Sequence, residues 1–207
     1  MNFLKFLLAS CAKVRVPRVL VLLLTVAFLA SAFFPTDLQT YPHDRELLAP
    51  SEPFANGVEH YARFINTALQ VGIPMLLWDR EGLAQLAVIA VVTTLATHGT
   101  KHLVNNLIVD GTRLGQRPGG IDSRYNIPSG HSSMASSAVY FLARRYALAF
   151  LWVTVPVLLM TMYARIALGA HTLSAVLAGA FLGLLVAAIF TSPWGQRRTT
   201  QPMRLQG

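Results

Sequence analysis

The feature that most constrains this chain is a series of long apolar segments, each close to the length that crosses a membrane. A transmembrane helix needs about 20 predominantly apolar residues. We predict six helices, at residues 19–34, 61–78, 83–99 (or on to about 109), 133–146, 147–164 and 172–191. Only 13% of the 207 residues are charged, against about 25% in soluble proteins. The expected fold is therefore all-α, an integral membrane bundle of six transmembrane helices.

Charge and hydropathy divide the chain into three parts. Residues 1–18 form a basic segment, residues 19–192 the membrane domain, and residues 193–207 a basic tail. A cleavable signal peptide is a competing interpretation of the start, because "FLASA" at 28–32 resembles a cleavage site. We favour a retained first helix, since residues 1–18 are long for a signal-peptide leader. Residues 35–59 are polar and proline-rich, and we expect a loop there, with a short interfacial helix as an alternative.

Basic residues predict the orientation of the bundle. They lie before the first helix, after the second, at Arg144 and Arg145 after the fourth, and at Arg197 and Arg198 after the sixth. Six alternating helices bring all four groups to one side, which the positive-inside rule makes cytoplasmic. We therefore expect a multi-pass protein of a bacterial inner membrane, with both termini cytoplasmic.

Other classes of protein are less compatible with the composition. The formal net charge is +8, but no basic run interleaved with aromatic residues indicates nucleic-acid binding. The lone Cys11 excludes an internal disulfide and a cysteine metal cluster.

Several basic residues break the orientation rule, because they fall on the opposite, outward face. They are Lys101, Arg113, Arg117, Arg124 and Arg165. Anchoring to lipid headgroups is one explanation. They also lie close to three polar segments, "RLGQRPGG" (113–120), "PSGHSS" (128–133) and "ARIALGAH" (164–171). This clustering favours an anionic ligand on the outer face.

The second of these segments has the composition of a helix start that binds phosphate. Ser129 can cap the helix, and Gly130 permits close approach of the backbone to a ligand. The free N–H groups of a first helical turn, helped by the helix dipole, bind phosphate.

Arginine and histidine side chains complete a candidate site. Arg117 and Arg165 carry forked donors that suit phosphate oxygens. His131 and His171 stand at the starts of two neighbouring predicted helices, where they could divide the roles of nucleophile and general acid.

These segments together resemble the type 2 phosphatidic acid phosphatase family, the membrane branch of the acid phosphatase–vanadium haloperoxidase superfamily. The family pattern is K-x6-R-P, then P-S-G-H, then S-R-x5-H-x3-D. Here Arg117-Pro118, the segment 128–131, and Arg165 with His171 match it in order, within roughly residues 60–192. The resemblance implies hydrolysis of a phosphomonoester or pyrophosphate without a metal or other cofactor.

The resemblance also implies a role for each matched residue. His171 would attack phosphorus and form a phosphohistidine, while His131 would protonate the leaving oxygen and later help to activate water. The groups that would hold the phosphate oxygens are Arg117, Arg165, Lys101, the Ser129 hydroxyl and the Gly130 N–H.

The first motif departs from the family pattern. Asp110 stands where the pattern has lysine, and Lys101 lies nine residues earlier. An insertion could still bring Lys101 to the phosphate, or Arg113 could fill the cationic role. Otherwise Lys101 is an interfacial anchor.

The third motif departs in two places. Ala164 replaces the serine, and Ala175 replaces the aspartate that would orient His171 from one helical turn away. Ser174, Asp110 or Asp122 could accept the Nδ1 proton of His171 instead. Without such an acceptor the enzyme would be slow or inactive.

Two further patterns have structural explanations. His98 and His102 have the spacing of a metal pair, but no third ligand matches, and we expect His102 to pack at the interface or against a loop. Gly179 and Gly183 fit G-x3-G, which favours close helix packing.

The sequence therefore predicts a membrane lipid phosphatase with its site facing the periplasm. Isoprenyl pyrophosphates, phosphatidic acid, phosphatidylglycerol phosphate and the lipid A phosphates are all compatible substrates. A lipid phosphotransferase is a second possibility. The alanine at position 175 keeps a third open, a non-catalytic phospholipid-binding membrane protein. The sequence does not indicate an oligomeric state.

Overall fold

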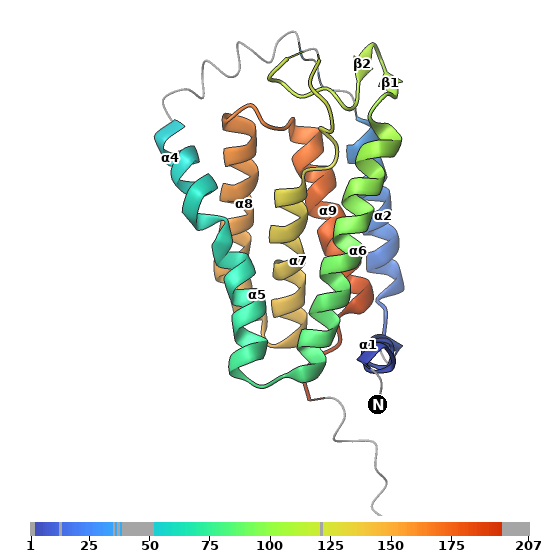
Figure 1. Ribbon diagram of the computed structural model, residues 1–207, viewed down its shortest axis with the longest axis vertical. Helices are drawn as coiled ribbons and strands as arrows, with labels where there is room; N and C mark the ends of the chain where they lie inside the picture. Colours follow the sequence, from blue (N-terminus) through green and yellow to red (C-terminus); the bar gives the residue numbers. More distant parts are fainter. Residues whose placement is uncertain are drawn as a thin grey trace, which may run out of the picture.

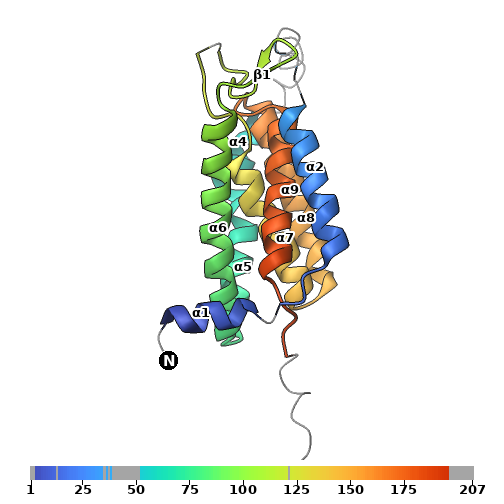
Figure 2. The same ribbon diagram turned by 90° about the vertical axis from the view of Figure 1, so that its right-hand side faces the viewer.

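The computed structural model describes residues 3–12, 14–34, 36, 38, 52–120 and 122–195, and over these residues the chain is mainly helical. The helices are α1 (Phe3–Ala12), α2 (Arg18–Phe33), α4 (Glu52–Gly57), the π-helical turn η2 (Val58–Ala62), α5 (Phe64–Leu76), α6 (Arg80–Val104), α7 (Gly130–Arg145), the 3-10 turn η3 (Leu148–Phe150), α8 (Leu151–Ala167) and α9 (Leu173–Phe190). Helices α2 and α5 to α9 run along the long axis of the molecule (Figure 1). Helix α1 lies across one end, which we call the α1 end (Figure 2). The opposite end, which carries the α6–α7 connection, is the loop end.

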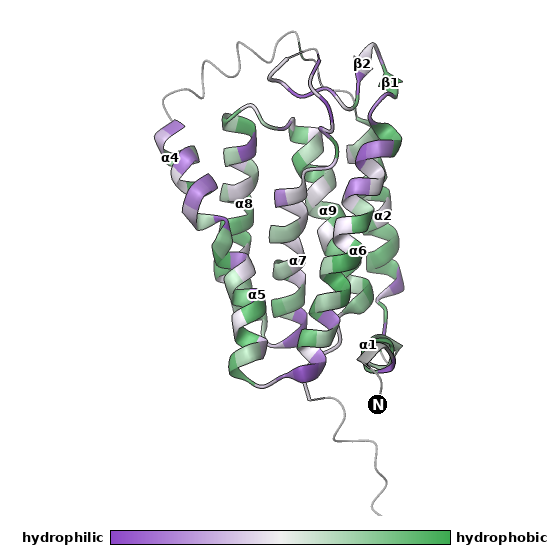
Figure 3. Cartoon of the chain, viewed as in Figure 1, coloured by the Kyte–Doolittle hydropathy of each residue, from purple (hydrophilic) through white to green (hydrophobic). Residues whose placement is uncertain are grey.

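Hydrophobic residues cover the middle of the bundle, and hydrophilic residues gather toward its ends (Figure 3). Within the described residues, three helical stretches are long and apolar enough to cross a membrane: Arg80–Val104, Leu148–Ala167 and Leu173–Phe190. Many large apolar side chains remain exposed on the bundle, among them Leu22, Leu95, Trp152 and Leu159. An exposed apolar surface of this extent indicates contact with lipid or another apolar partner. The helical fold is confirmed, whereas membrane crossing by all six predicted helices stays a prediction.

Each predicted apolar segment contains a helix, and the differences lie at the ends. Helix α7 begins at Gly130, the helix start expected from Ser129 and Gly130, and so before the apolar segment 133–146. Helix α6 ends at Val104 and does not extend to 109. The chain instead forms the strands β1 (Ile108–Val109) and β2 (Thr112–Arg113), an antiparallel hairpin that is the exception to the expected all-α fold.

In the stretch 35–59, where we expected a loop with a short interfacial helix as the alternative, the last part is helical. Residues 39–51 lie outside the described ranges, but Glu52–Gly57 form α4, which continues through η2 into α5. Single π-helical turns inserted in this way often occur at functional sites. Glu59 lies in this turn.

The glycine pair of α9 packs against α7, as predicted. A Cβ at Gly179 would clash with the Ser129 carbonyl oxygen, and one at Gly183 with that of Ser133. Both helices meet through small residues, since Ser132, Ser133 and Ser136 of α7 are buried. This close contact fixes the first turn of α7 next to the start of α9.

One arginine of the predicted basic cluster after the fourth helix is not a solvated loop charge. Arg144 is exposed, but Arg145 is buried and donates to both carboxylate oxygens of Asp79, at 2.5 and 2.6 Å. The cluster does lie at the α1 end. The adjacent residues Arg197 and Arg198 lie outside the described ranges.

Candidate active site

The three polar segments singled out in the sequence meet at the loop end. The α6–α7 connection reaches the α8–α9 connection where Asn126 Nδ2 donates to Thr172 Oγ1 at 2.9 Å. The start of α7 joins the start of α9 where the Ser129 N–H donates to the Ala175 carbonyl at 2.8 Å. Helix packing therefore forms one site from three segments that are separate in the sequence, at residues 113–120, 128–133 and 164–171.

His171 is held in one orientation in the turn between α8 and α9. Its backbone N–H donates to the Arg165 carbonyl at 3.1 Å. Its ring nitrogen Nδ1 lies 2.8 Å from the Asn126 carbonyl oxygen. Because a carbonyl only accepts, Nδ1 carries the hydrogen and Nε2 keeps its lone pair. This is the tautomer that a nucleophile needs.

Electrostatics keep the ring of His171 neutral. The side chain is buried. Burial first, and then the charges of Lys101, Arg165 and Arg117, hold its pKa far below the usual value, while the Asn126 bond has a smaller opposite effect. A neutral imidazole is available for attack at every pH near neutrality.

Asn126 occupies the role expected of the missing aspartate, and sequence reasoning did not identify it. Ala175 is fully buried in an apolar cluster with Val104, Leu114 and Ile127. Ser174, one of the proposed replacements, instead shares a hydrogen bond with the Thr172 hydroxyl at 2.9 Å. A backbone carbonyl carries no sequence signal, so no motif could have found this acceptor.

Lys101 is buried rather than anchored at an interface. Its Nζ donates to the Tyr125 carbonyl at 2.6 Å, and Arg117 Nη2 donates to the same oxygen at 3.3 Å. Tyr125 has a φ of +63°, a left-handed backbone conformation that residues other than glycine rarely adopt. Arg113, the alternative cation, donates to the Ser123 carbonyl in the same connection. The charges that act on His171 include that of Lys101, which makes Lys101 the better candidate for the first motif.

Ser129 and Gly130 stand at the N-terminus of α7, as predicted, but the serine side chain does not cap the helix. The Ser129 hydroxyl is buried and has no hydrogen-bond partner among the described residues. The first N–H groups of a helix also lack intrahelical acceptors. This turn therefore offers a hydroxyl and backbone donors to an anion.

His131 contacts Arg63, and Arg63 in turn pairs with Glu59; the sequence reasoning missed both Arg63 and Glu59. Arg63 Nη1 hydrogen-bonds His131 Nε2. Glu59 Oε1 pairs with Arg63 at 3.2 Å and with Arg165 at 2.7 Å. The spacing of Glu59 and Arg63 is that of an i,i+4 ion pair, a signal that needs the segment to be recognised as helical.

Unpartnered donors mark the site as a place for an anion. The Nε atoms of Arg63, Arg117 and Arg165 are buried and have no hydrogen-bond partner within the described ranges, like the Ser129 hydroxyl. Buried donors are rarely left unsatisfied in the absence of a ligand. Burial, and then the charge of Arg165, lower the pKa of the Arg117 guanidinium. A bound anion would relieve the repulsion between Arg117 and Arg165.

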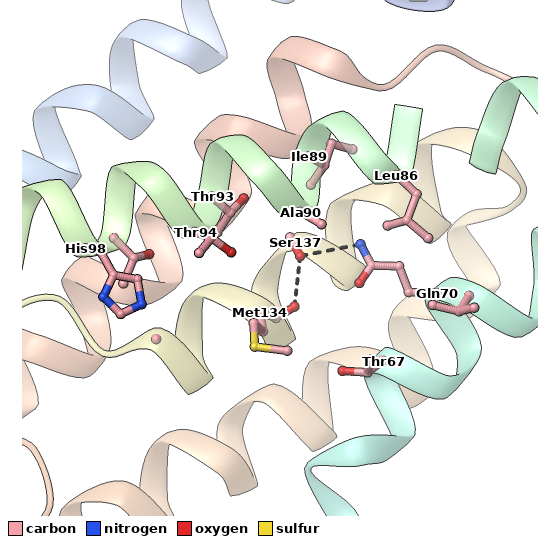
Figure 4. Close-up of a pocket in the computed structure, with 13 residues that line it drawn as sticks. Thr67, Gln70, Leu86, Ile89, Ala90, Thr93, Thr94, His98, Met134 and Ser137 are labelled. Atoms are coloured by element: carbon pink, nitrogen blue, oxygen red, sulfur yellow. Dashed lines mark hydrogen bonds between the residues drawn. The ribbon is translucent and has the colours of Figure 1, made fainter. Parts of the chain in front are cut away.

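A cavity of about 220 Å³ extends from this site between α5, α6 and α7. Figure 4 shows its lining, which runs from His98 at one end to Leu86 and Gln70 at the other. Gly130 and Thr97 also line it, so the cavity adjoins the start of α7. Its walls combine aliphatic side chains with threonines and contain no Asp, Glu, Lys or Arg.

The histidine pair of α6, His98 and His102, has no third candidate metal ligand beside it in the described part of the chain. No cluster of three His, Cys, Asp or Glu side chains is present among the described residues. The His102 ring packs edge-on against Tyr125, with ring centroids 5.0 Å apart. The predicted packing role of His102 is confirmed.

Comparison with known proteins gives a family match and named relatives. A family model described as PAP2 superfamily matches residues 82–199, more than half of the chain. The lipid A 1-phosphatase of Helicobacter pylori strain J99 is 49% identical over 136 residues, which cover 65% of this chain and 70% of that protein. Its counterpart from strain 26695 is 47% identical over 145 residues, 70% of this chain and 75% of that protein.

A more distant relative is the lipid A 4′-phosphatase of strain J99. It is 30% identical over 128 residues, 61% of this chain and 64% of that protein. No solved structure matches this chain.

Proposed function

This chain belongs to the PAP2 superfamily, as its resemblance to the type 2 phosphatidic acid phosphatases predicted, and from that premise we propose its substrate and mechanism. It is a membrane phosphatase that acts on a lipid phosphate. The substrate we propose is the 1-phosphate of a lipid A-type glycolipid. The support is that the 1-phosphatases are 47 to 49% identical to this chain and the 4′-phosphatase is 30% identical.

The observation that carries the mechanism is the setting of His171. Its Nδ1 hydrogen is donated to Asn126, and its ring stays neutral beside three cations. Nε2 attacks phosphorus in line, and an N–P bond forms as the bond to the leaving lipid oxygen breaks. His131, in its protonated form, gives that oxygen a proton, then accepts one from the water that hydrolyses the phosphohistidine.

Positive charge around the phosphate stabilises the transition state. Lys101, Arg117 and Arg165 supply fixed cations, and the Ser129 hydroxyl with the Gly130 N–H supplies neutral donors. Such groups act most strongly when they are held in place before the reaction. The hydrogen bonds from Lys101 and Arg117 to the Tyr125 carbonyl hold these two cations in place.

A lipid substrate fits the surroundings of the site. The cavity between α5, α6 and α7 adjoins Gly130 and has walls without Asp, Glu, Lys or Arg, so an acyl chain could lie there while the phosphate meets the cations.

The membrane arrangement is part of the proposal. Helices α2 and α5 to α9 would cross a bacterial inner membrane, with the α1 end cytoplasmic and the loop end in the periplasm. This agrees with the positions of Arg80, Arg144 and Arg145, which lie at or beside helix ends at the α1 end.

The decisive experiment is phosphate release by His171→Ala from a panel of lipid phosphates in detergent. The panel contains lipid A 1-phosphate, lipid A 4′-phosphate, phosphatidic acid and an isoprenyl pyrophosphate. We expect a loss of at least about 10⁴-fold, as when a catalytic nucleophile is removed. His60→Ala is the matched control, because His60 is exposed in η2 and should leave turnover at the parent value.

Each part of the proposal has an outcome that contradicts it. Undiminished release by His171→Ala rules out the nucleophile. Strict dependence on an added metal rules out metal-free hydrolysis. Transfer of phosphate to a lipid acceptor instead of water identifies a phosphotransferase. Affinity for all four lipids without turnover of any identifies a binding protein.

A further inference from the structure

One acidic residue, Glu59, lies among the cations of the candidate site, and none of the three motifs includes it. Its Oε1 atom is 2.7 Å from Arg165 Nη1 and 3.2 Å from Arg63 Nη1. A single carboxylate oxygen therefore bridges two guanidinium groups. The other oxygen, Oε2, is buried without a hydrogen-bond partner among the described residues.

The packing of α4 and η2 on α8 fixes this bridge. Ala55 and Val58 are buried against Ala164 and Ala167. Small side chains on both elements let their backbones approach closely, so that Glu59 faces Arg165 next to this contact. The π-helical turn then places Arg63 one turn further on, beside His131.

The bond between Arg63 and His131 restricts what the histidine can do. A guanidinium group donates hydrogen bonds and does not accept them. His131 Nε2 must therefore be the acceptor, which makes the ring neutral with its hydrogen on Nδ1. Before His131 can donate a proton from Nε2, Arg63 has to move away, and Glu59 is already in contact to receive it.

We propose that Glu59 and Arg63 are positioning residues of the phosphatase site: Glu59 orients Arg165, and Arg63 orients the ring of His131. This proposal rests on the proposed function. Glu59 binds Arg165 through Nη1 and leaves its Nε free to meet phosphate. As a negative charge close to the anion, Glu59 also weakens binding of phosphate itself, so it favours correct geometry over tight binding.

If Glu59 improves the geometry of the site but weakens phosphate binding, Glu59→Gln should lower turnover and tighten phosphate binding. We expect kcat to fall by at least about tenfold, because Arg165 loses the carboxylate that orients it. Couplings between residues in contact typically correspond to about 2- to 150-fold. Inorganic phosphate should bind about two- to fivefold more tightly, because a like charge is removed. Both quantities can be measured on the purified full-length protein, the second by calorimetry.

A matched control and a conservative variant separate this role from a general effect on folding. Glu52→Gln removes an exposed carboxylate from the neighbouring α4 and should change neither quantity. Glu59→Asp keeps the negative charge and should have the phosphate affinity of the parent. Its kcat should lie between those of the parent and Glu59→Gln. If Glu59→Gln does not fold, Glu59→Asp still tests the role of the side chain. A lower kcat with unchanged phosphate affinity in Glu59→Gln would mean only a smaller active fraction, and would overturn the proposal.

A double-mutant cycle tests whether Glu59 acts through Arg165. If it does, Glu59→Gln combined with Arg165→Lys should be no more than about threefold slower than Arg165→Lys alone. Multiplication of the two single effects would overturn the proposal. Should the parent protein release phosphate from no lipid, the proposed function fails by itself. The affinity of Glu59→Gln for inorganic phosphate then still tests whether Glu59 lies beside a bound anion.

Discussion

The two ends of the bundle enclose arginine side chains in opposite ways: Arg145 is buried at the α1 end, and Arg117 and Arg165 are partly buried at the loop end. At the α1 end, Arg145 bonds to Asp79, to the Gln85 side chain at 3.1 Å and to the Ser192 carbonyl at 2.9 Å. At the loop end, Arg117 and Arg165 each keep a buried Nε without a partner among the described residues. A satisfied arginine contributes to the fold, and an unsatisfied one is available to a ligand.

Asp79, the acidic partner of Arg145 at the α1 end, also receives several hydrogen bonds. Burial by itself would raise the pKa of Asp79, but hydrogen bonds from Arg145, the Gly82 N–H and the Tyr146 hydroxyl lower it below its ordinary value. Asp79 therefore stays ionised opposite Arg145. The comparison implies that substitutions at the α1 end should change stability, while those at the loop end should change activity.

The largest effect is expected from Arg145→Met at the α1 end. The substitution leaves the Asp79 carboxylate buried without its counter-ion, which costs about 3–5 kcal/mol of folding free energy. Chemical unfolding in detergent measures it, and the exposed neighbour variant Arg144→Met is the control. Equal stabilities of the two variants would show that the buried pair does not hold this end together.

A smaller effect, and on a different property, is expected from Arg117→Gln at the loop end. Turnover should fall about 10²- to 10³-fold, as when one preorganised donor to a transition state is lost. Stability should not fall, because one of several mutually repelling cations is removed. Phosphate release and thermal unfolding measure the two properties, and Arg124→Gln, an exposed arginine of the same connection, is the control. Loss of stability without loss of turnover would contradict the expectation that the loop end affects activity and the α1 end affects stability.

The smallest effect on activity is expected from Ala175→Asp, which restores the family aspartate. We expect turnover to rise by no more than about twofold, against the roughly 10⁴-fold effect of the analogous aspartate in serine proteases. The reason is that His171 already donates Nδ1–H to Asn126, and position 175 lies among apolar side chains. Turnover should be scaled to the folded fraction. A gain of tenfold or more would mean that Asn126 is a poor substitute for the carboxylate.

Much of the site was predictable from sequence, because its motif residues are chemically distinctive. Arg117, His131, Arg165 and His171 all reach the loop end, and Lys101 joins them despite its unusual spacing. The insertion in the first motif forms the β1–β2 hairpin, with Asp110 at its turn in a left-handed conformation. The loop therefore lengthens without moving the arginine away from the site.

Other features were hidden from sequence for identifiable reasons. Asn126 serves His171 through a backbone carbonyl, which every residue has. Glu59 lies in a proline-rich stretch that was predicted to be a loop, so its helical spacing to Arg63 went unrecognised. The pairing of Arg145 with Asp79 was not predicted, because nothing local shows that Asp79 lies opposite it.

The sequence by itself determined the six long helices, their order and most of the residues that can do the chemistry, since apolar length and motif spacing are local properties of the chain. Only the tertiary structure decided which groups those residues pair with. The bonds from His171 to Asn126, His131 to Arg63 and Arg165 to Glu59 join positions 45, 68 and 106 residues apart. Such contacts depend on how the helices pack, and side-chain volumes distributed over the whole bundle set that packing.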